Sequence, residues 1–256
     1  MRAALALMLG LLAPVPALAQ EVKAPIIPIL VGASEKAAQV SVVVDRGLRS
    51  SKRLKRSLRV ARKAMQEGEE ISLPDMRALA MARDGLAAQR YVRAMQAGAV
   101  ERNPSDLAYL AAIAVGTGRV WTLKPMIEAM RELDPATEPK DRINTYIRVL
   151  YPHAWAGNAL ALEALVLFNG EGRLFGPLSD TTRDRILAQA KKQADGRTEL
   201  RLAMGILETE RAKDTADAAQ MAQAAAYLEA AAQSDHLDVS TTAQNLRRMI
   251  EEPDKT

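Results

Sequence analysis

The stretch from Gly157 to Gly172 places its apolar residues at intervals of three and four, the spacing of one face of an α-helix. These apolar positions are Leu160, Ala164, Leu165, Leu167 and Phe168. Gly170 follows the last of them, where glycine commonly ends a helix with a left-handed cap. The pattern therefore predicts one helix that stops close to Gly170.

The same helical pattern returns twice at a fixed interval. Gly196 and Asp235 follow Gly157 at successive steps of 39 residues, and each opens another stretch with helical spacing. The corresponding apolar positions, which we expect to be buried, are Leu165, Phe168, Met204, Leu207 and Leu246. A repeat of this length is typical of helical solenoids, in which each helix pair buries its apolar face against the next pair.

Residues 71–252 as a whole read as helix after helix with short connections. Ser72 and Asn103 each stand where a helix N-cap is expected, with proline in the first turn that follows. Helices are predicted over 72–82, 86–98, 103–116, 122–133, 140–151, 158–169, 180–194, 198–211, 215–233 and 240–251. Aromatic residues make up only 4% of the chain, which favours close-packed helices over strands, so we predict an all-α fold.

Residues 34–70 predict a long amphipathic helix before this repeat region. Alternating steps of three and four connect Ala37, Val40, Val44, Gly47, Ser51, Leu54, Leu58, Ala61 and Met65. The apolar seam is weak at Gly47 and Ser51, where we expect a break if there is one. Residues 39–45, QVSVVVD, are rich in valine and keep a strand as the alternative.

Positive charge is concentrated in this predicted helix. Nine cations and no acid lie between residues 46 and 63, namely Arg46, Arg49, Lys52, Arg53, Lys55, Arg56, Arg59, Arg62 and Lys63. On a helix they would fan out opposite Leu54, Leu58 and Ala61. One interpretation is a solvated face over a packed apolar stripe. The other is a binding surface for an anionic partner, because solvated faces usually mix both signs of charge.

The start of the chain has the pattern of an export signal. Arg2 precedes a short apolar run, and Ala17-Leu18-Ala19 resembles a signal-peptidase site. We therefore expect residues 1–19 to be a signal peptide cleaved after Ala19, residues 20–33 to be an extended leader, and the protein to be periplasmic. Removal of the signal takes away one cation and lowers the formal net charge from +4 to +3. The chain has no cysteine, which excludes disulfides and a lipid anchor at this signal.

Several of these segments resemble Sel1-like repeats, a branch of the tetratricopeptide-like helical repeats. Ala161-x3-Leu165-x2-Phe168-x-Gly170-x-Gly172 looks like the first helix and G-x-G turn of such a repeat, and Tyr227–Gln233 resembles the end of a second helix. The segment from Asp84 to Gly98 looks like another first helix. The resemblance implies a scaffold or adaptor that binds protein in a concave groove, and it implies no catalytic residues.

Residues with catalytic or ligand-binding chemistry form no recognisable motif in this sequence. His153 and His236 have no partner at metal-ligand spacing, and there is no cysteine nucleophile and no G-x-S-x-G motif. We therefore predict no enzyme activity, no metal and no cofactor. Trp121 and Trp155 are expected to be packing anchors rather than ligand-stacking residues.

Two functions of different kinds remain after this search. The first is a periplasmic adaptor that binds an envelope protein or peptide through the groove of its repeats. The second is an envelope-surface binder that docks on anionic lipid or glycan through the helix Arg46–Lys63. Nucleic acid is not expected, because the chain carries an export signal and no aromatic residue lies among the cations to stack on bases.

Overall fold

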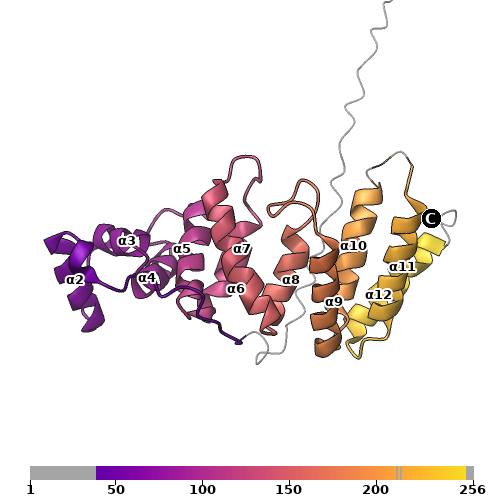
Figure 1. Ribbon diagram of the computed structural model, residues 1–256, viewed down its shortest axis with the longest axis horizontal. Helices are drawn as coiled ribbons and strands as arrows, with labels where there is room; N and C mark the ends of the chain where they lie inside the picture. Colours follow the sequence, from indigo (N-terminus) through magenta and orange to yellow (C-terminus); the bar gives the residue numbers. More distant parts are fainter. Residues whose placement is uncertain (1–38, 212, 214, 252–256) are drawn as a thin grey trace, which may run out of the picture. The chain divides into compact units, whose positions relative to one another are not determined.

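The computed structural model describes residues 39–211, 213 and 215–251, which all belong to one unit of the chain, Gly32–Thr256. Within these residues there are eleven α-helices, two short 3-10 helices and no strand, so the predicted all-α class is confirmed for this part of the chain (Figure 1). The elements are η1 (Ser51–Arg53), α2 (Arg56–Gln66), α3 (Leu73–Met81), α4 (Gly85–Gln96), α5 (Pro104–Gly116), η2 (Val120–Thr122), α6 (Leu123–Met130), α7 (Lys140–Trp155), α8 (Ala159–Phe168), α9 (Asp180–Gln193), α10 (Arg197–Arg211), α11 (Ala218–Ala232) and α12 (Leu237–Glu251).

Most helices begin where a short polar side chain can cap them. In six cases the side-chain oxygen of the N-cap residue accepts a hydrogen bond from a backbone N–H of the first turn. These caps are Ser72, Asp84, Asn103, Asn158, Ser179 and Asp217. The predicted starts at Ser72 and Asn103 are therefore confirmed, each with a proline in the first helical turn.

Helices that follow one another in the chain also pack on one another. α3 contacts α4, α4 contacts α5, and α5 contacts both α6 and α7; the series continues through α8, α10, α11 and α12. The core between them contains mainly leucine, alanine, methionine and valine, with Tyr146 as its largest fully buried side chain. No helix of the described residues is both long and apolar enough to cross a membrane.

The 39-residue register has a counterpart in the packing of the last helices. α8, α10 and α12 begin at residues 159, 197 and 237, and α10 contacts both of the others. The turns that precede α10 and α12 also touch, because Ser234 Oγ donates to the carbonyl of Asp195, 39 residues earlier, at 2.6 Å. Leu165 and Phe168 are buried as predicted, whereas Met204, Leu207 and Leu246 are only half-buried.

The long amphipathic helix predicted for residues 34–70 is wrong for the part that the structure describes. Only Arg56–Gln66 is α-helical, and residues 39–50, here called the 39–50 segment, are neither helix nor strand, so the strand alternative is wrong as well. Two backbone conformations are incompatible with a continuous helix, namely Gly47, which has φ +60°, and Lys55, an N-cap residue with ψ 153°. Residues 34–38, the predicted signal peptide and the leader lie outside the described residues.

The 39–50 segment is held by hydrogen bonds to helices far along the chain. The N–H groups of Val44 and Asp45 donate to the Gly116 carbonyl at the end of α5. The N–H of Val42 donates to His153 Nε2 at 3.2 Å, and Asn158 Nδ2 donates to the Val40 carbonyl at 2.8 Å. These non-local partners satisfy the backbone without a helix, which explains why the local pattern was misleading.

Helix α7 also differs from its prediction, because it continues through Pro152 to Trp155. A proline in a helix removes one N–H donor and crowds the carbonyl four residues earlier. Here it lies in the last turn, and the end of the helix is still capped, since Ala156 N donates to the Pro152 carbonyl and Asn158 N to the His153 carbonyl. The extension places His153 beside the 39–50 segment.

Candidate functional site

The nine predicted cations divide into eight on the surface and one inside the fold. Those on the surface, called the basic surface here, are Arg46, Arg49, Lys52, Arg53, Lys55, Arg56, Arg59 and Lys63. They come from the 39–50 segment, from η1, from Lys55 at the N-cap of α2, and from α2 itself. Three different backbone geometries therefore contribute to this surface, where the sequence predicted one continuous helix.

Helix α2 presents its cations to solvent because its apolar residues pack against the protein. Met65 is fully buried, and Leu54, Leu58 and Ala61 are partly buried against the core. This confirms the predicted apolar stripe only from Leu54 to Met65, and Val60 on α2 lies outside it. With that stripe in contact with the core, the charged side chains of α2 are left on its outer side.

Arg62 is the exception, and its role is structural. Its Nε atom lies 2.7 Å from Asp84 Oδ2, and its Nη2 atom donates to the Leu48 carbonyl at 2.8 Å. Only 17% of its side chain is exposed. Since Asp84 also caps α4, Arg62 connects α2 to α4 and to the 39–50 segment. It is therefore not available to a partner.

The basic surface has almost no countercharge of its own. Lys63 lies 3.7 Å from Glu67, and no other member of the surface forms an ion pair with any residue that the structure describes. Like charges at i, i+4 repel by roughly 0.2–0.5 kcal/mol per pair, as for Lys55 with Arg59 and Arg59 with Lys63. The surface therefore carries a positive field that an anionic partner would relieve.

An apolar concavity of about 580 Å³ lies beside the basic surface, between α2 and the start of α3. Val60 and Ala61 line it from α2, and Ile71 lines it from the connection to α3. Val60 is unusual for a valine because 63% of it is exposed. Arg56 of α2 and Asp75 of α3 also line it. The site thus combines cations with space for apolar side chains.

A second concavity, of about 370 Å³, follows α10 and is called the α10 groove here. Its floor is a stripe of α10 at helical spacing, made of Arg201, Leu202, Gly205, Ile206, Thr209 and Glu210. Leu178 lies on one wall and Tyr227 on the other. A Cβ atom added at Gly205 would meet no atom within 4 Å, so the floor is open there. The stripe extends for about 13 Å at 1.5 Å per residue.

Charged groups that line the α10 groove are largely paired. Arg201 Nη2 lies 3.0 Å from Glu163 Oε2, and Lys213 Nζ lies 2.6 Å from Glu210 Oε1. The other oxygen of Glu210 accepts from the Asp217 N–H at 2.7 Å. The groove therefore has a mixed lining, in which Leu202 and Ile206 supply the apolar part of the floor and most charges are paired; such a lining suits a peptide better than a small charged ligand.

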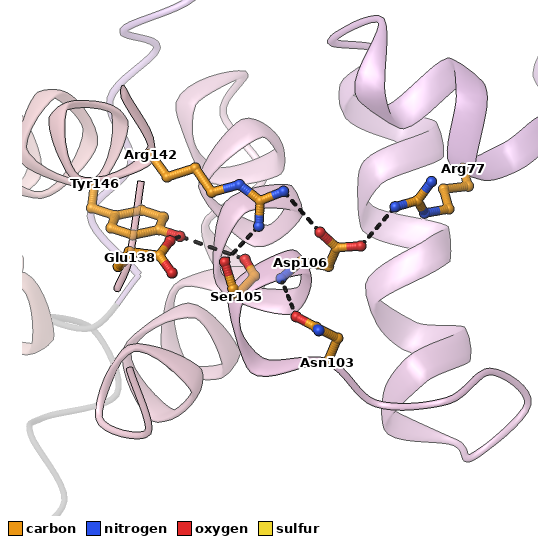
Figure 2. Close-up of polar contacts among 7 residues, drawn as sticks. All are labelled: Arg77, Asn103, Ser105, Asp106, Glu138, Arg142 and Tyr146. Atoms are coloured by element: carbon orange, nitrogen blue, oxygen red, sulfur yellow. Dashed lines mark hydrogen bonds and ion pairs between the residues drawn. The ribbon is translucent and has the colours of Figure 1, made fainter. Parts of the chain in front are cut away.

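A partly exposed ion-pair network joins α3, α5 and α7. Asp106 on α5 lies 2.8 Å from Arg77 of α3 and 2.8 Å from Arg142 of α7 (Figure 2). Burial disfavours the charged form of Asp106, but the hydrogen bonds from the two arginines outweigh it, so the pKa of this carboxyl lies below its usual value. Every group is held by another side chain, so the network joins three helices and has no free acid or base.

Tyr146 extends this polar region into the core. Its hydroxyl donates to Glu138 Oε1 at 2.6 Å, and Figure 2 shows it pointing toward Ser105 as well. Burial, and then the hydrogen bond to Glu138, raise the pKa of Tyr146 above its usual value. A phenol held in this way stays protonated and contributes to packing.

The two histidines do not form a metal site with their neighbours. His153 is fully buried, with Nδ1 donating to the Val149 carbonyl at 2.8 Å and Nε2 accepting from Val42 N. Both ring nitrogens are therefore used within the fold, and His236 is an exposed residue before α12. In the part of the chain that the structure describes, no group of three or more His, Asp and Glu residues could hold a metal ion.

Of the two tryptophans, only Trp155 packs as predicted. It meets Tyr151 edge-on at 5.6 Å between ring centroids, and the guanidinium of Arg185 lies 4.4 Å from its ring centroid. Trp121 is 65% exposed, so its prediction as a packing anchor is wrong. It lies in the short η2 turn, where Val120 and Thr122 take the buried positions.

Sequence reasoning missed the α10 groove and the concavity beside Val60. Gly205 was the only local signal for the groove, as a glycine inside a helical pattern that otherwise favours alanine. Comparisons with protein-family models, with curated proteins and with solved structures gave no match for this chain. The likeness to Sel1-like repeats therefore depends on the residues that carry it.

Proposed function

We propose that this protein is a non-catalytic helical-repeat scaffold of the bacterial periplasm that binds an envelope protein or peptide. The main support is the packing of α8, α10 and α12, whose starts keep close to the 39-residue register and whose preceding turns at Asp195 and Ser234 touch. Repeats of this kind stack helix pairs and use the surface of successive helices for binding. The periplasmic location is proposed from the pattern of residues 1–19.

The α10 groove is the binding surface proposed for this scaffold. It follows one first helix of the proposed repeats, and its length of about 13 Å matches roughly four residues of extended peptide at 3.3 Å each. The open floor at Gly205 leaves room for a side chain of the partner. The charges at the groove's rim are paired, so covering them with a peptide would cost less desolvation free energy than covering unpaired charges.

Site-specific photo-crosslinking in intact cells tests this proposal. A photoreactive residue at Thr209, an exposed position in the groove, should give a discrete adduct with a second protein. The same residue at Ala188, exposed on α9 and outside the groove, is the matched control and should give none. The groove proposal would be wrong if Thr209 gave no adduct or if both positions gave the same adducts.

A second candidate function, docking on anionic lipid or glycan, is favoured by the unpaired cations of the basic surface. The apolar stripe of α2 is packed on the core and Val60 is its one exposed large apolar side chain, so this helix has no broad apolar face to bury in a bilayer. Only electrostatic attraction remains, worth roughly 1 kcal/mol at most for each cation near the surface. Such binding would be strongly sensitive to salt.

Co-sedimentation with anionic vesicles or envelope glycan tests the second function. Binding at low salt should be abolished by the combined reversal of Arg53, Arg56, Arg59 and Lys63 to Glu. It should also weaken as added salt shortens the screening length from about 10 Å at 0.1 M to about 3 Å at 1 M. Helicity and melting should change little, because these side chains face solvent. If the wild-type protein co-sediments with neither anionic vesicles nor envelope glycan at low salt, this function is excluded.

A further inference from the structure

The basic surface and the apolar concavity between α2 and α3 adjoin each other, and Arg56 belongs to both. Around α2, Arg56, Arg59 and Lys63 follow one line at intervals of three and four residues, which extends for about 10 Å along the helix. Val60 lies on the flank of this line that faces the concavity. One helix edge is therefore charged and the edge next to it is apolar.

Within the described residues, few elements cover the flank of helix α2 that carries Val60. The principal helix contact of α2 is with α3, and Leu58, Ala61 and Met65 on its buried side pack in the core. Elsewhere in the described chain a helix such as α4 or α10 contacts helices on both sides. The concavity beside Val60 thus has the position that a further packed helix would take.

We propose that this site binds an acidic amphipathic helix of a partner protein. Apolar side chains of that helix would fill the concavity over Val60, Ala61 and Ile71, and carboxylates spaced at i, i+3 or i+4, and i+7 would meet the cation line. Asp75 of α3 favours a basic or neutral residue on the edge of the partner that faces α3. The inference rests on the proposed scaffold function and names the partner chemistry for a second surface.

The choice of a helix over a lipid surface follows from the position of the apolar groups. The exposed apolar groups here, Val60 with its neighbours Ala61 and Ile71, lie in one small open hollow between α2 and α3, whereas a helix that lies in a bilayer buries a broad apolar face. The charge asymmetry between Arg56 and Asp75 also specifies an orientation. A uniformly anionic surface would gain nothing from Asp75.

Binding of synthetic peptides to the full mature chain tests this inference. The probe is a fluorescent peptide of about five helical turns, with leucines at helical spacing and glutamates along one edge. A scrambled peptide of the same composition keeps the charge and loses the apolar stripe. Fluorescence anisotropy should show binding of the first peptide and at least about tenfold weaker binding of the second, since apolar anchors dominate such interfaces.

Three protein variants separate the contributions. Val60→Asp should weaken peptide binding by about tenfold or more, and Arg56→Glu with Arg59→Glu should do the same. Lys191→Glu with Lys192→Glu makes the same change in net charge at exposed positions of α9 and should leave binding unchanged. Circular dichroism should show that all three variants stay folded, because each altered side chain is exposed.

Several results would overturn the inference. No binding of the amphipathic peptide, or equal binding of the scrambled peptide, would contradict it. Anionic vesicles that bind Val60→Asp as well as they bind the wild type would indicate a general polyanion surface. Light scattering that shows a dimer dissociated by Val60→Asp would assign the concavity to a second copy of the chain. If the peptide does not bind but the Thr209 adduct forms, only the inference about α2 is wrong and the proposed scaffold function is unaffected. If the peptide binds but the Thr209 adduct does not form, the α10 groove is excluded as the binding surface.

Discussion

His153 joins the 39–50 segment to α7 only in its neutral form, because Nε2 must accept a hydrogen bond from Val42 N. Burial lowers the pKa of His153, and the hydrogen bond to Val149 does not compensate for it. The unfolded chain, with a histidine pKa near 6.5, therefore takes up a proton more readily than the folded one. This contribution to stability is fully present above about pH 6.5 and is lost as the pH falls through the folded pKa.

We expect the free energy of unfolding to decrease more steeply between about pH 7 and pH 5 in the wild type than in His153→Gln. Glutamine can still accept from Val42 N and does not titrate. Urea denaturation at a series of pH values measures this, and the difference between the two proteins removes the contribution of carboxylates such as Asp106. Parallel pH curves for the two proteins would contradict the assigned role of His153.

Two helical glycines should respond in opposite ways to alanine. A Cβ atom at Gly85 would lie 1.9 Å from Thr117 Oγ1 and 2.7 Å from Arg119 Nη1, so Gly85→Ala should destabilise the protein by about 1–3 kcal/mol through overcrowding. Gly205→Ala meets open space inside α10 and should stabilise it by about 0.5–1 kcal/mol. Thermal melting of both variants checks the pair, and a stabilising Gly85→Ala would refute the described packing.

Arg62 shows that cations of one sequence run can have different environments in the fold. Its neighbours Arg59 and Lys63 are exposed, yet Arg62 is held between Asp84 and the Leu48 carbonyl. All three have the same charge and stand in one run of cations, so composition gave no reason to separate them. The distinction comes from a carboxylate 22 positions away, and only the folded chain brings the two together.

The helices themselves were largely predictable, because their limits are set locally. Asparagine, serine and aspartate caps mark most starts, and glycines with positive φ follow α2, α4, α5 and α7. The 39–50 segment was not predictable in this way. Its valines keep helical steps of four, but its backbone partners are Gly116, His153 and Asn158, which local spacing cannot reveal.

Truncation of Phe168 tests whether adjacent helices are energetically coupled. Phe168 is buried at the end of α8, with its ring 5.6 Å from that of Phe175. Phe168→Ala should cost roughly 3–5 kcal/mol, as other core aromatic truncations do. In a repeat array the loss should first affect α9 and α10, which hydrogen exchange of their amides would detect. Unchanged melting would show that the 39-residue register does not describe the core.

For the whole molecule, charge is distributed unevenly along the chain. The formal net charge is only +4, although nine cations and no acid occupy residues 46–63. Near-neutrality therefore conceals one region with a strong local field, and partner binding there should depend on ionic strength much more than the net charge suggests.

Export is the prediction that concerns the chain as a whole. Intact-mass measurement of protein from an osmotic-shock fraction should find a species that begins at Gln20, because the residues before it have the pattern of a signal peptide. Protein that retains residues 1–19, or protein missing from this fraction, would contradict both the signal and the periplasmic location. Cytoplasmic protein with the same helical content would leave the fold unaffected.

The contacts of the 39–50 segment impose an order on biosynthesis. A ribosome delivers residues 39–50 long before α7 and α8, yet Val42 and Val40 find their partners 111 and 118 positions later. Closing loops of this length is slow, and it must wait until those helices have been made. The first described residues to be synthesised thus gain their last anchors only after α7 has been made. A nascent chain shorter than 153 residues lacks both of these partners, and one shorter than 158 residues still lacks Asn158.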